Sequence, residues 1–485
     1  MAGWAPSGGR GGAGPFRRVR RRRRGAYSAF HRHVGTAVHD PRARSSARRP
    51  SGGPGSAPSA QAPLGAAGHG PSRPGTTPGR RDPLGGGRKV HVDVVIVGGG
   101  MVGATLARAC LQAGLHTALV EARPPSPDAG TGPFAQRVSA ITPGAETVLR
   151  TLGVWSGVTA RRVCAYRRMH VWDALGGGEI HFDARDVAEP RLGHIVENDV
   201  LIAALHEQLE GCEVFCPDTI SELETKPERV RVRLTSGRVL NASLAVAADG
   251  ARSRLRGLAG IGFRPRPYAQ HALVGPMHMD RAHGACARQR FLPNGPLALL
   301  PLPDDWVSIV WTTTPEEAAE LAALPEAKFA DRLVAASEGV LGSVRHVGPR
   351  AVFPLVGGQA DVYVRPRIAL VGDAAHVIHP LAGQGVNLGI LDAATLAESI
   401  AGRRDPGRIG VLRRYERARR GDDELTMRLM EAFRYVFGSR LAPVVRLRSL
   451  GLSWTDALPP IKTRLTRLAM DIAGERPRLA RGLML

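Results

Sequence analysis

Two glycine-rich segments of this chain carry residues whose types and spacing suit the binding of a phosphate-containing cofactor. The first contains Gly98, Gly100 and Gly103, directly after a run of β-branched residues. Glycines at this spacing allow a tight turn, a close approach of the backbone to a pyrophosphate, and close packing of the next helix on its strand. Glu121 ends the following predicted strand, where a carboxylate accepts hydrogen bonds from an adenosine ribose. This segment therefore predicts a dinucleotide site, for FAD or a nicotinamide.

The second segment begins at Gly372 and is richer in glycine and proline than an ordinary loop. Asp373 follows a predicted strand, at the carboxyl edge of the sheet where ligands collect. Pro380 makes the loop rigid, and Gly383 and Gly385 permit a close approach of the backbone to a ligand. The two segments together predict one extended cofactor that is held at both ends.

Strands and helices alternate around both segments. Residues 92–97 and 116–120 are predicted strands, and residues 102–113 form the helix between them. We expect Asn387 to cap a helix over residues 388–400 whose N-terminus faces the cofactor. A helix dipole in this position suits a flavin, which becomes anionic when reduced, and so favours FAD over a nicotinamide. The fold class is α/β, with a Rossmann-like FAD-binding domain.

The middle of the chain predicts a second, mainly antiparallel sheet that is inserted into this domain. Its expected strands combine aromatic and polar residues over residues 168–173, 288–292, 297–302 and 306–311. These side chains either line a substrate pocket or fill the core of the sheet, which is the more frequent role. His376 and His379 are candidates for acid–base chemistry, but no proton-transfer role is assigned to either, and His376 is expected to be structural or to lie near the flavin.

The first 89 residues differ from the rest of the chain in composition. Residues 1–90 hold 18 of the 66 Lys and Arg residues but only 2 of the 43 Asp and Glu residues, so they carry +16 of the formal net charge of +23. Their Gly, Pro, Ser and Arg content predicts a disordered leader without a core. It is interpreted as a misassigned start, an organelle transit peptide, or a patch for anionic membranes or nucleic acid. Nucleic-acid binding is the weakest of these, because few aromatic residues accompany the arginines.

The remaining composition excludes several classes of protein. Five scattered cysteines do not predict a disulfide framework, and no cluster has the spacing of a metal site. No run reaches the roughly 18 apolar residues of a membrane span. Residues 413–485 alternate Leu, Met and Val with many arginines, which predicts basic amphipathic helices. Such helices present a solvated face or make peripheral contact with lipid.

The motifs resemble a known family. The first glycine segment, Asp249–Gly250 and residues 372–389 resemble the single-component FAD-dependent aromatic hydroxylases, which have the fold of p-hydroxybenzoate hydroxylase. Further segments narrow the resemblance to the ubiquinone-biosynthesis hydroxylases, over residues 137–141, 152–155, 193–198 and 415–419. The resemblance covers residues 90–485 and leaves out the leader.

This resemblance implies roles for individual residues. Gly98, Gly100 and Gly103 would bind the pyrophosphate and Glu121 the adenosine ribose. Arg137 and Asp373, with Gly372 before it, would lie at the ribityl and phosphate portion, although Ala135 stands where many relatives carry an acid. The Asp249–Gly250 segment would serve both FAD and the nicotinamide donor. Pro380 would shape the oxygen-reactive face of the flavin, and the ring would be surrounded by Gly383, Gln384, Gly385 and Asn387.

The resemblance also implies a reaction. NAD(P)H would reduce the flavin transiently, and the enzyme would use O2 to hydroxylate the ring of a polyprenylated phenol in ubiquinone biosynthesis. The alternatives are a hydroxylase of another phenol, and a prenyl reductase or halogenase on the same scaffold, although the Trp-x-Trp-x-Ile segment expected of a halogenase is missing. No metal is implied. Expected partners are the pathway's other proteins and a membrane surface, and nucleic acid is not expected.

Domain organisation and location follow from the same resemblance. We expect a peripheral position on the cytoplasmic face of the inner membrane, or on the matrix face in mitochondria if the leader is a transit peptide. Cofactor-domain segments are expected to alternate with the substrate sheet and to precede a helical region. The leader covers 1–89, the FAD-binding domain 90–165, 190–258 and 352–402, the substrate sheet 166–189 and 259–351, and the helical region 403–485.

Overall fold

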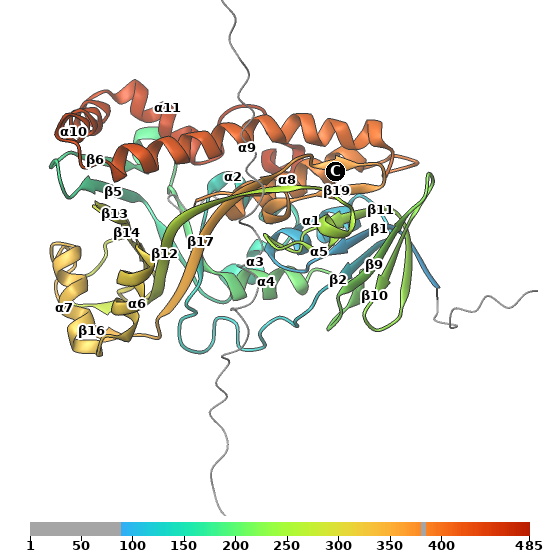
Figure 1. Cartoon of the computed structure of the whole chain (residues 1–485), viewed down its shortest axis with the longest axis horizontal. Helices are drawn as coiled ribbons and strands as arrows, with labels where there is room; N and C mark the ends of the chain where they lie inside the picture. Colours follow the sequence, from blue (N-terminus) through green and yellow to red (C-terminus); the bar gives the residue numbers. More distant parts are fainter. Residues whose placement is uncertain (1–88, 380–384) are drawn as a thin grey trace, which may run out of the picture. The chain divides into compact units, whose positions relative to one another are not determined.

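The computed structural model describes residues 89–379 and 385–485. The leader up to residue 88 lies outside the described residues, and so do Pro380, Gly383 and Gln384 of the second glycine segment. Figure 1 shows the arrangement of the described elements.

An eight-stranded sheet forms the centre of the cofactor domain. Its main path has the order β18-β19-β11-β1-β2-β8, and the four strands β19, β11, β1 and β2 run parallel to one another. A β-branched run makes β1, and Val94, Val95 and Ile96 are fully buried in the central strand of the sheet. The strands are β1 (Lys89–Val97), β2 (Thr117–Val120), β8 (Glu213–Phe215), β9 (Ile220–Thr225), β10 (Val230–Leu234), β11 (Val239–Ala247), β18 (Val364–Arg365) and β19 (Ile368–Leu370).

Helices from distant parts of the sequence pack together on this sheet. The helix α1 follows the first glycine segment and packs against α8, which follows the second. Leu106, Ile390 and Leu396 belong to one continuous apolar core. The helices are α1 (Met101–Gln112), α2 (Pro143–Thr151), α3 (Trp155–Thr159), α4 (Asn198–His206), α5 (Arg254–Leu258) and α8 (Gly385–Ile400).

The predicted inserted sheet is confirmed as a nine-stranded sheet. Its order is β20-β17-β12-β15-β14-β13-β5-β6, with β16 beside β12, and its pairs are antiparallel except β13 with β5. Apolar side chains of α6 and α7 pack on it, and Trp311, Phe329 and Leu333 share a separate core. The elements are β5 (Arg168–Asp173), β6 (Glu179–Asp183), β12 (Phe263–Met279), β13 (Cys286–Leu292), β14 (Gly295–Pro301), β15 (Trp306–Thr313), α6 (Pro315–Ala323), α7 (Glu326–Ala336), β16 (Val344–Val347), β17 (Ala351–Ala360) and β20 (His376–Val377).

A small three-stranded sheet connects the two larger ones along the chain. It has the order β3-β7-β4, and both of its pairs are antiparallel. The bounds are β3 (Val138–Ile141), β4 (Val163–Tyr166) and β7 (Gly193–Glu197). Because β3 begins at Val138, this sheet holds the segment that carries Arg137.

Three helices close the chain, as the amphipathic pattern predicts. The long α9 runs across one side of the picture, α10 packs beside β6, and α11 packs against α10 (Figure 1). The helices are α9 (Ile409–Gly438), α10 (Ala442–Ala457) and α11 (Pro459–Ala469). Among the helices that the structure describes, none has both the length and the hydrophobicity needed to cross a bilayer.

Candidate active site

The first glycine segment forms a turn that only glycine can make. Gly98 has a φ of +104°, and a Cβ there would clash with the carbonyl of Ala248. A Cβ on Gly103 would likewise clash with the carbonyl of Gly98, so this glycine lets α1 approach the turn. A Cβ on Gly100 would meet nothing within 4 Å, which shows that the backbone there faces open space. The first amides of α1 are therefore available to a phosphate.

Glu121 lies beside this turn, as predicted from its place at the end of β2. Its Oε2 accepts a hydrogen bond from the amide of Gly99 at 2.5 Å, and its Oε1 accepts one from the amide of Arg123 at 2.9 Å. The imidazole Nε2 of His206 lies 2.7 Å from the carbonyl oxygen of Gly99. The carboxylate thus braces the turn, a role that the sequence did not suggest, and His206 was missed because it comes from α4. A ribose contact of Glu121 stays a prediction.

A hollow of about 390 Å³ opens next to the start of α1. It is lined by Gly100, Met101, Ala135, Gln136, Arg137, Asn198, Asp199, Ile202 and Phe353. The guanidinium of Arg137 is exposed and lies 5.6 Å from the centre of the Phe353 ring. The hollow therefore joins the first glycine segment to the residue expected near the cofactor phosphates.

The segment before Arg137 is held by Glu197, although Ala135 itself has no polar side chain. The amide of Ala135 donates a hydrogen bond to Oε1 of Glu197 at 2.6 Å. Arg162 Nε donates to the other oxygen of this buried carboxylate, also at 2.6 Å. A carboxylate supplied by β7 thus orders the backbone of this loop.

The two glycine-rich segments meet in space. Val102 of α1 packs against Gly372, and a Cβ on Gly389 would lie 2.5 Å from Cγ2 of Val102. The side chain of Asp373 is accessible to solvent. The many protein atoms around its carboxyl nevertheless raise its pKa, while the charges of His376 and Arg137 lower it. Arg137 and Asp373 are therefore within electrostatic range of each other, as one shared cofactor site requires.

The Asp249–Gly250 segment connects the two glycine segments. Oδ2 of Asp249 accepts hydrogen bonds from the first two amides of α5, those of Arg254 at 2.7 Å and Leu255 at 3.1 Å, while Ser253 is the N-cap residue. Oδ1 of Asp249 is buried without a hydrogen-bond partner among the described residues. Arg256, which follows, donates to the carbonyl of Ala374 at 2.9 Å. One carboxylate oxygen therefore remains for a ligand.

The expected helix cap at Asn387 is wrong. The helix α8 already begins at Gly385, and Asn387 lies inside it, fully buried. Its Oδ1 accepts from the amide of Thr142 at 3.1 Å, and its Nδ2 donates to the carbonyl of Ala140 at 2.8 Å. The side chain thus pairs two backbone groups at the end of β3. These groups would lose this hydrogen-bond partner if Asn387 capped the helix instead. The roles of Gly385 and Asn387 around the flavin stay predictions.

A buried charge cluster lies directly behind Asp373 and consists of His376, Asp392, Arg419 and Asp423. Asp392 and Asp423 are fully buried. His376 Nε2 is 2.6 Å from Oδ2 of Asp392 and 3.3 Å from Oδ2 of Asp423. Arg419 donates to both carboxylates, at 2.7 Å and 2.9 Å. Two carboxylates thus face two cationic side chains, with Arg419 on their Oδ1 atoms and His376 on their Oδ2 atoms.

The cluster holds a proton on His376. Burial lowers the pKa of His376, but Asp423 and Asp392 outweigh it and raise the pKa to about 9. Burial and the neighbouring Asp392 raise the pKa of Asp423 to about 6. The pKa of Asp392 is lowered because His376 and Arg419 outweigh its burial. His376 is therefore part of a buried charge cluster, and the expectation that it is structural or lies near the flavin stays a prediction. Asp392 could have been noticed in the sequence as a charge among the apolar residues of the predicted helix, which must find a partner.

His379 has the opposite character. Burial and the nearby Arg434 lower its pKa to about 4. Its Nε2 lies 3.2 Å from Oε1 of Gln270, and the Gln270 amide donates to the carbonyl of Asn294 at 2.7 Å. His379 is thus a neutral imidazole that is hydrogen-bonded to the inserted sheet.

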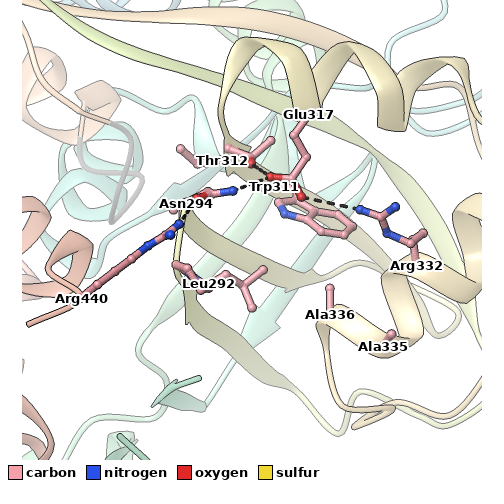
Figure 2. A pocket seen from close by; sticks show the side chains of 12 residues that line it. Leu292, Asn294, Trp311, Thr312, Glu317, Arg332, Ala335, Ala336 and Arg440 are labelled. Atoms are coloured by element: carbon pink, nitrogen blue, oxygen red, sulfur yellow. Dashed lines mark hydrogen bonds and ion pairs between the residues drawn. The ribbon is translucent and has the colours of Figure 1, made fainter. Parts of the chain in front are cut away.

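Asn294 also lies at a hollow of about 400 Å³ between the inserted sheet, α6 and α7 (Figure 2). Arg440 donates to Oδ1 of Asn294 at 2.9 Å, and the Asn294 amide donates to Glu317 at 2.9 Å. Trp311 lines the same space from β15. One tryptophan of the predicted pocket strands therefore lines a hollow, although its ring is mostly buried in the sheet core.

Comparison with known proteins now identifies the chain. Residues 91–428 match the family described as FAD binding domain. The chain belongs to this family. A ubiquinone hydroxylase, UbiL of Rhodospirillum rubrum, is 36% identical over 426 residues, covering 85% of this chain and 97% of that protein. The 3-demethoxyubiquinol 3-hydroxylase of Escherichia coli is 35% identical over 78% of this chain and 98% of its own length.

Known structures agree with the fold of this FAD-binding family member. The p-nitrophenol 4-monooxygenase of Pseudomonas putida superposes with a TM-score of 0.67 at 20% identity, over 80% of this chain and all of that chain. The predicted α/β fold with an inserted sheet and C-terminal helices is confirmed. The chain is an FAD-dependent monooxygenase.

The residues present fit FAD. The open backbone at Gly100 and the free N-terminus of α1 suit a pyrophosphate. The unpaired Oδ1 of Asp249, the exposed Asp373 and the cationic Arg137 offer polar groups of both signs along one path. These groups come from three separate parts of the chain, as an extended dinucleotide requires.

Proposed function

We propose that this enzyme hydroxylates the aromatic ring of a polyprenylated phenol, a ubiquinone precursor, with NAD(P)H as electron donor and O2 as the oxygen source. The observation that carries the proposal is the contact between the two glycine segments near the hollow that Arg137 lines. The similarity of the chain to a ubiquinone hydroxylase and to a 3-demethoxyubiquinol 3-hydroxylase supports it. Bound FAD would supply the electron transfer from NAD(P)H and the activation of O2.

The chain's own residues would bind and orient the cofactor. Gly98, Gly100 and Gly103 would hold the pyrophosphate, and Glu121 would orient the ribose while it braces the turn. The remaining contacts are proposed for Arg137, Asp249, Gly250, Gly372, Asp373, Gly383, Gln384, Gly385 and Asn387, with Pro380 shaping the face of the flavin where oxygen reacts. Protonated His376 would favour the charged form of Asp373, because its positive charge lowers the pKa of this carboxyl.

The substrate ring would be presented from the inserted sheet. His379, the last described residue before Gly385, is hydrogen-bonded to Gln270 of this sheet, and burial keeps His379 uncharged. A neutral, apolar surrounding is needed because water must be kept away from an activated flavin. The predicted bounds of the alternating cofactor-domain and substrate-sheet segments stay a prediction.

Attachment to a membrane surface is part of the proposal, because a polyprenylated phenol dissolves in lipid. The attachment would be peripheral, on the cytoplasmic face of the inner membrane or, if the leader is a transit peptide, on the mitochondrial matrix face. Other proteins of the same pathway are proposed as partners.

The function is tested by anaerobic reduction of the purified yellow protein with NADPH or NADH, with and without a prenylphenol, followed by O2 and mass analysis of the product. We expect faster flavin reduction with the phenol and one atom of labelled oxygen in the product. An Asp373→Asn variant should lose FAD affinity, whereas the exposed control Asp305→Asn should not. A colourless protein that takes up no FAD, or a phenol returned without added oxygen, would refute the proposal.

A further inference from the structure

The last helices carry most of the exposed large hydrophobic side chains. Among the residues that the structure describes, fifteen of twenty such side chains lie between Leu425 and Met484. On α10, Leu447, Leu450 and Trp454 follow helical spacing and are 72%, 52% and 67% exposed. They therefore form one continuous apolar stripe on the helix and are not isolated exposed residues.

The inner faces of these helices are mainly polar, although Leu452 of α10 packs on the small apolar cluster around Phe291 and Phe437. The residues that α10 and α11 bury are Arg448, Ser449 and Thr466. The guanidinium of Arg448 donates to both oxygens of Asp173, at 2.7 Å and 2.9 Å, inside the protein. A helix on a water-exposed surface normally has the reverse arrangement, with its apolar side chains inside. The outward apolar stripe thus lacks an explanation in the folding of this chain.

These helices cannot simply turn their apolar faces inward. A Cβ on Gly178 would lie 2.5 Å from Cα of Ser449, so α10 is packed tightly on the loop after β5. Lys462 of α11 contacts Asp186 at 3.3 Å and Asp456 at 3.4 Å. The outward position of the apolar stripe is therefore set by several polar contacts on the inner side.

Charge distinguishes between possible partners of this surface. On α10 and α11, the exposed charged residues are Arg446, Arg464 and Arg467. The single acid, Asp456, is half-buried and accepts a hydrogen bond from the amide of His181 at 3.1 Å. A second copy of the chain would bring arginines against arginines, whereas an anionic lipid headgroup attracts them. Trp454 adds a side chain that favours the boundary between lipid and water.

We propose that α10 and α11, with the outer stripe of α9, lie in the headgroup region of an anionic bilayer. The C-terminal apolar face consists of Leu425, Leu429, Phe433, Leu447, Leu450, Trp454, Ile461, Leu465 and Leu468. Basic helices with large apolar side chains bind membranes in this manner without spanning them. Because Asp173 lies on β5, this contact would hold the inserted sheet next to the lipid. The inference gives a surface to the proposed membrane attachment and does not depend on the hydroxylation itself.

Vesicle flotation of the full-length protein tests this inference. Vesicles of phosphatidylcholine alone are compared with vesicles that also contain phosphatidylglycerol. Replacement of Leu447, Trp454 and Leu465 with Gln should weaken binding to the anionic vesicles at least about a hundredfold, because their buried apolar area is lost. The control replaces exposed Val214, Leu258 and Val356, which lie elsewhere, and should change binding less than about twofold.

The basic leader could bind the same vesicles and needs its own control. In a full-length background where the arginines between residues 17 and 24 are replaced with Gln, we expect binding to persist and to keep its dependence on the apolar face. Replacing Arg446, Arg464 and Arg467 with Glu in that background should remove the preference for anionic vesicles. Circular dichroism and FAD content show whether each variant is folded.

Three results would overturn the inference. Binding could vanish with the leader arginines, or the face variant and its control could bind equally well. Alternatively, the protein could ignore vesicles but form dimers in sedimentation experiments that only the face variant dissociates, which would assign the face to a second copy. A failure of the hydroxylase assay leaves the vesicle result unchanged, so the two proposals can fail separately.

Discussion

The buried charge cluster predicts a pH dependence of stability that can be traced to one side chain. The pKa of His376 is raised from 6.5 to about 9 in the folded protein. A group with a raised pKa stabilises the folded state fully below its unfolded pKa, and the contribution is lost as pH rises through the folded value. Stability from His376 is therefore complete below about pH 6.5 and disappears towards pH 9.

The difference between the two pKa values sets the magnitude. It corresponds to about 3 kcal/mol in total, of which about 2 kcal/mol falls between about pH 6 and about pH 8.5. Full burial of His376 means that solvent screening does not reduce this value greatly. The free energy of unfolding should thus fall by about 2 kcal/mol across this range because of His376 alone.

Urea unfolding of the native and His376→Gln proteins at several pH values measures this contribution. The variant should be less stable below pH 7 and should show a slope with pH that is smaller by about 2 kcal/mol over the range. The control His91→Gln changes an exposed histidine and should keep the native slope. Buried cysteines also have raised pKa values, but their contribution is the same in both proteins and cancels when the two pH dependences are subtracted. Equal slopes for native protein and His376→Gln would refute a charged imidazole in the cluster.

Three further predictions concern single positions. Gly98→Ala should abolish FAD binding and lower the free energy of unfolding by about 2 kcal/mol or more, because the φ of +104° excludes a Cβ and Ala248 blocks it; native stability in chemical denaturation would contradict this. Arg137→Ala should weaken FAD binding about tenfold in a flavin fluorescence titration with an unchanged melting temperature, since the side chain is exposed; unchanged affinity would remove Arg137 from the site. Asp173→Asn should cost about 3–5 kcal/mol in urea unfolding because it leaves Arg448 buried without its anion, and a loss below 1 kcal/mol would show that the pair is open to water.

The sequence was sufficient for the parts of this protein that depend on local geometry. The β-branched run of β1 and the spacing of Gly98, Gly100 and Gly103 predicted a strand, turn and helix, because only glycine tolerates that turn. The alternation of strands and helices predicted the α/β fold. Arg137 and Asp373 were predicted to share one site, and in the fold Arg137 lowers the pKa of Asp373.

Tertiary structure decided what depends on contacts between distant residues. Asn387 does not cap its helix, because its side-chain amide is hydrogen-bonded to backbone groups of Ala140 and Thr142 at the end of β3, far away in sequence. The cluster around His376 joins three segments of the chain. Buried charges must be paired, but no local sequence pattern shows which charged residues will pair with one another in the protein interior.

The C-terminal helices show the same division. Their alternation of leucine and arginine predicted amphipathic helices, but the period of a pattern does not say which side faces the protein. The contact between Asp173 and Arg448 turned the polar side inward and left the apolar side exposed. The sequence by itself thus determined the helices and their two faces, and packing determined which face remains for a partner, because a buried guanidinium must be paired where an apolar side chain need not be.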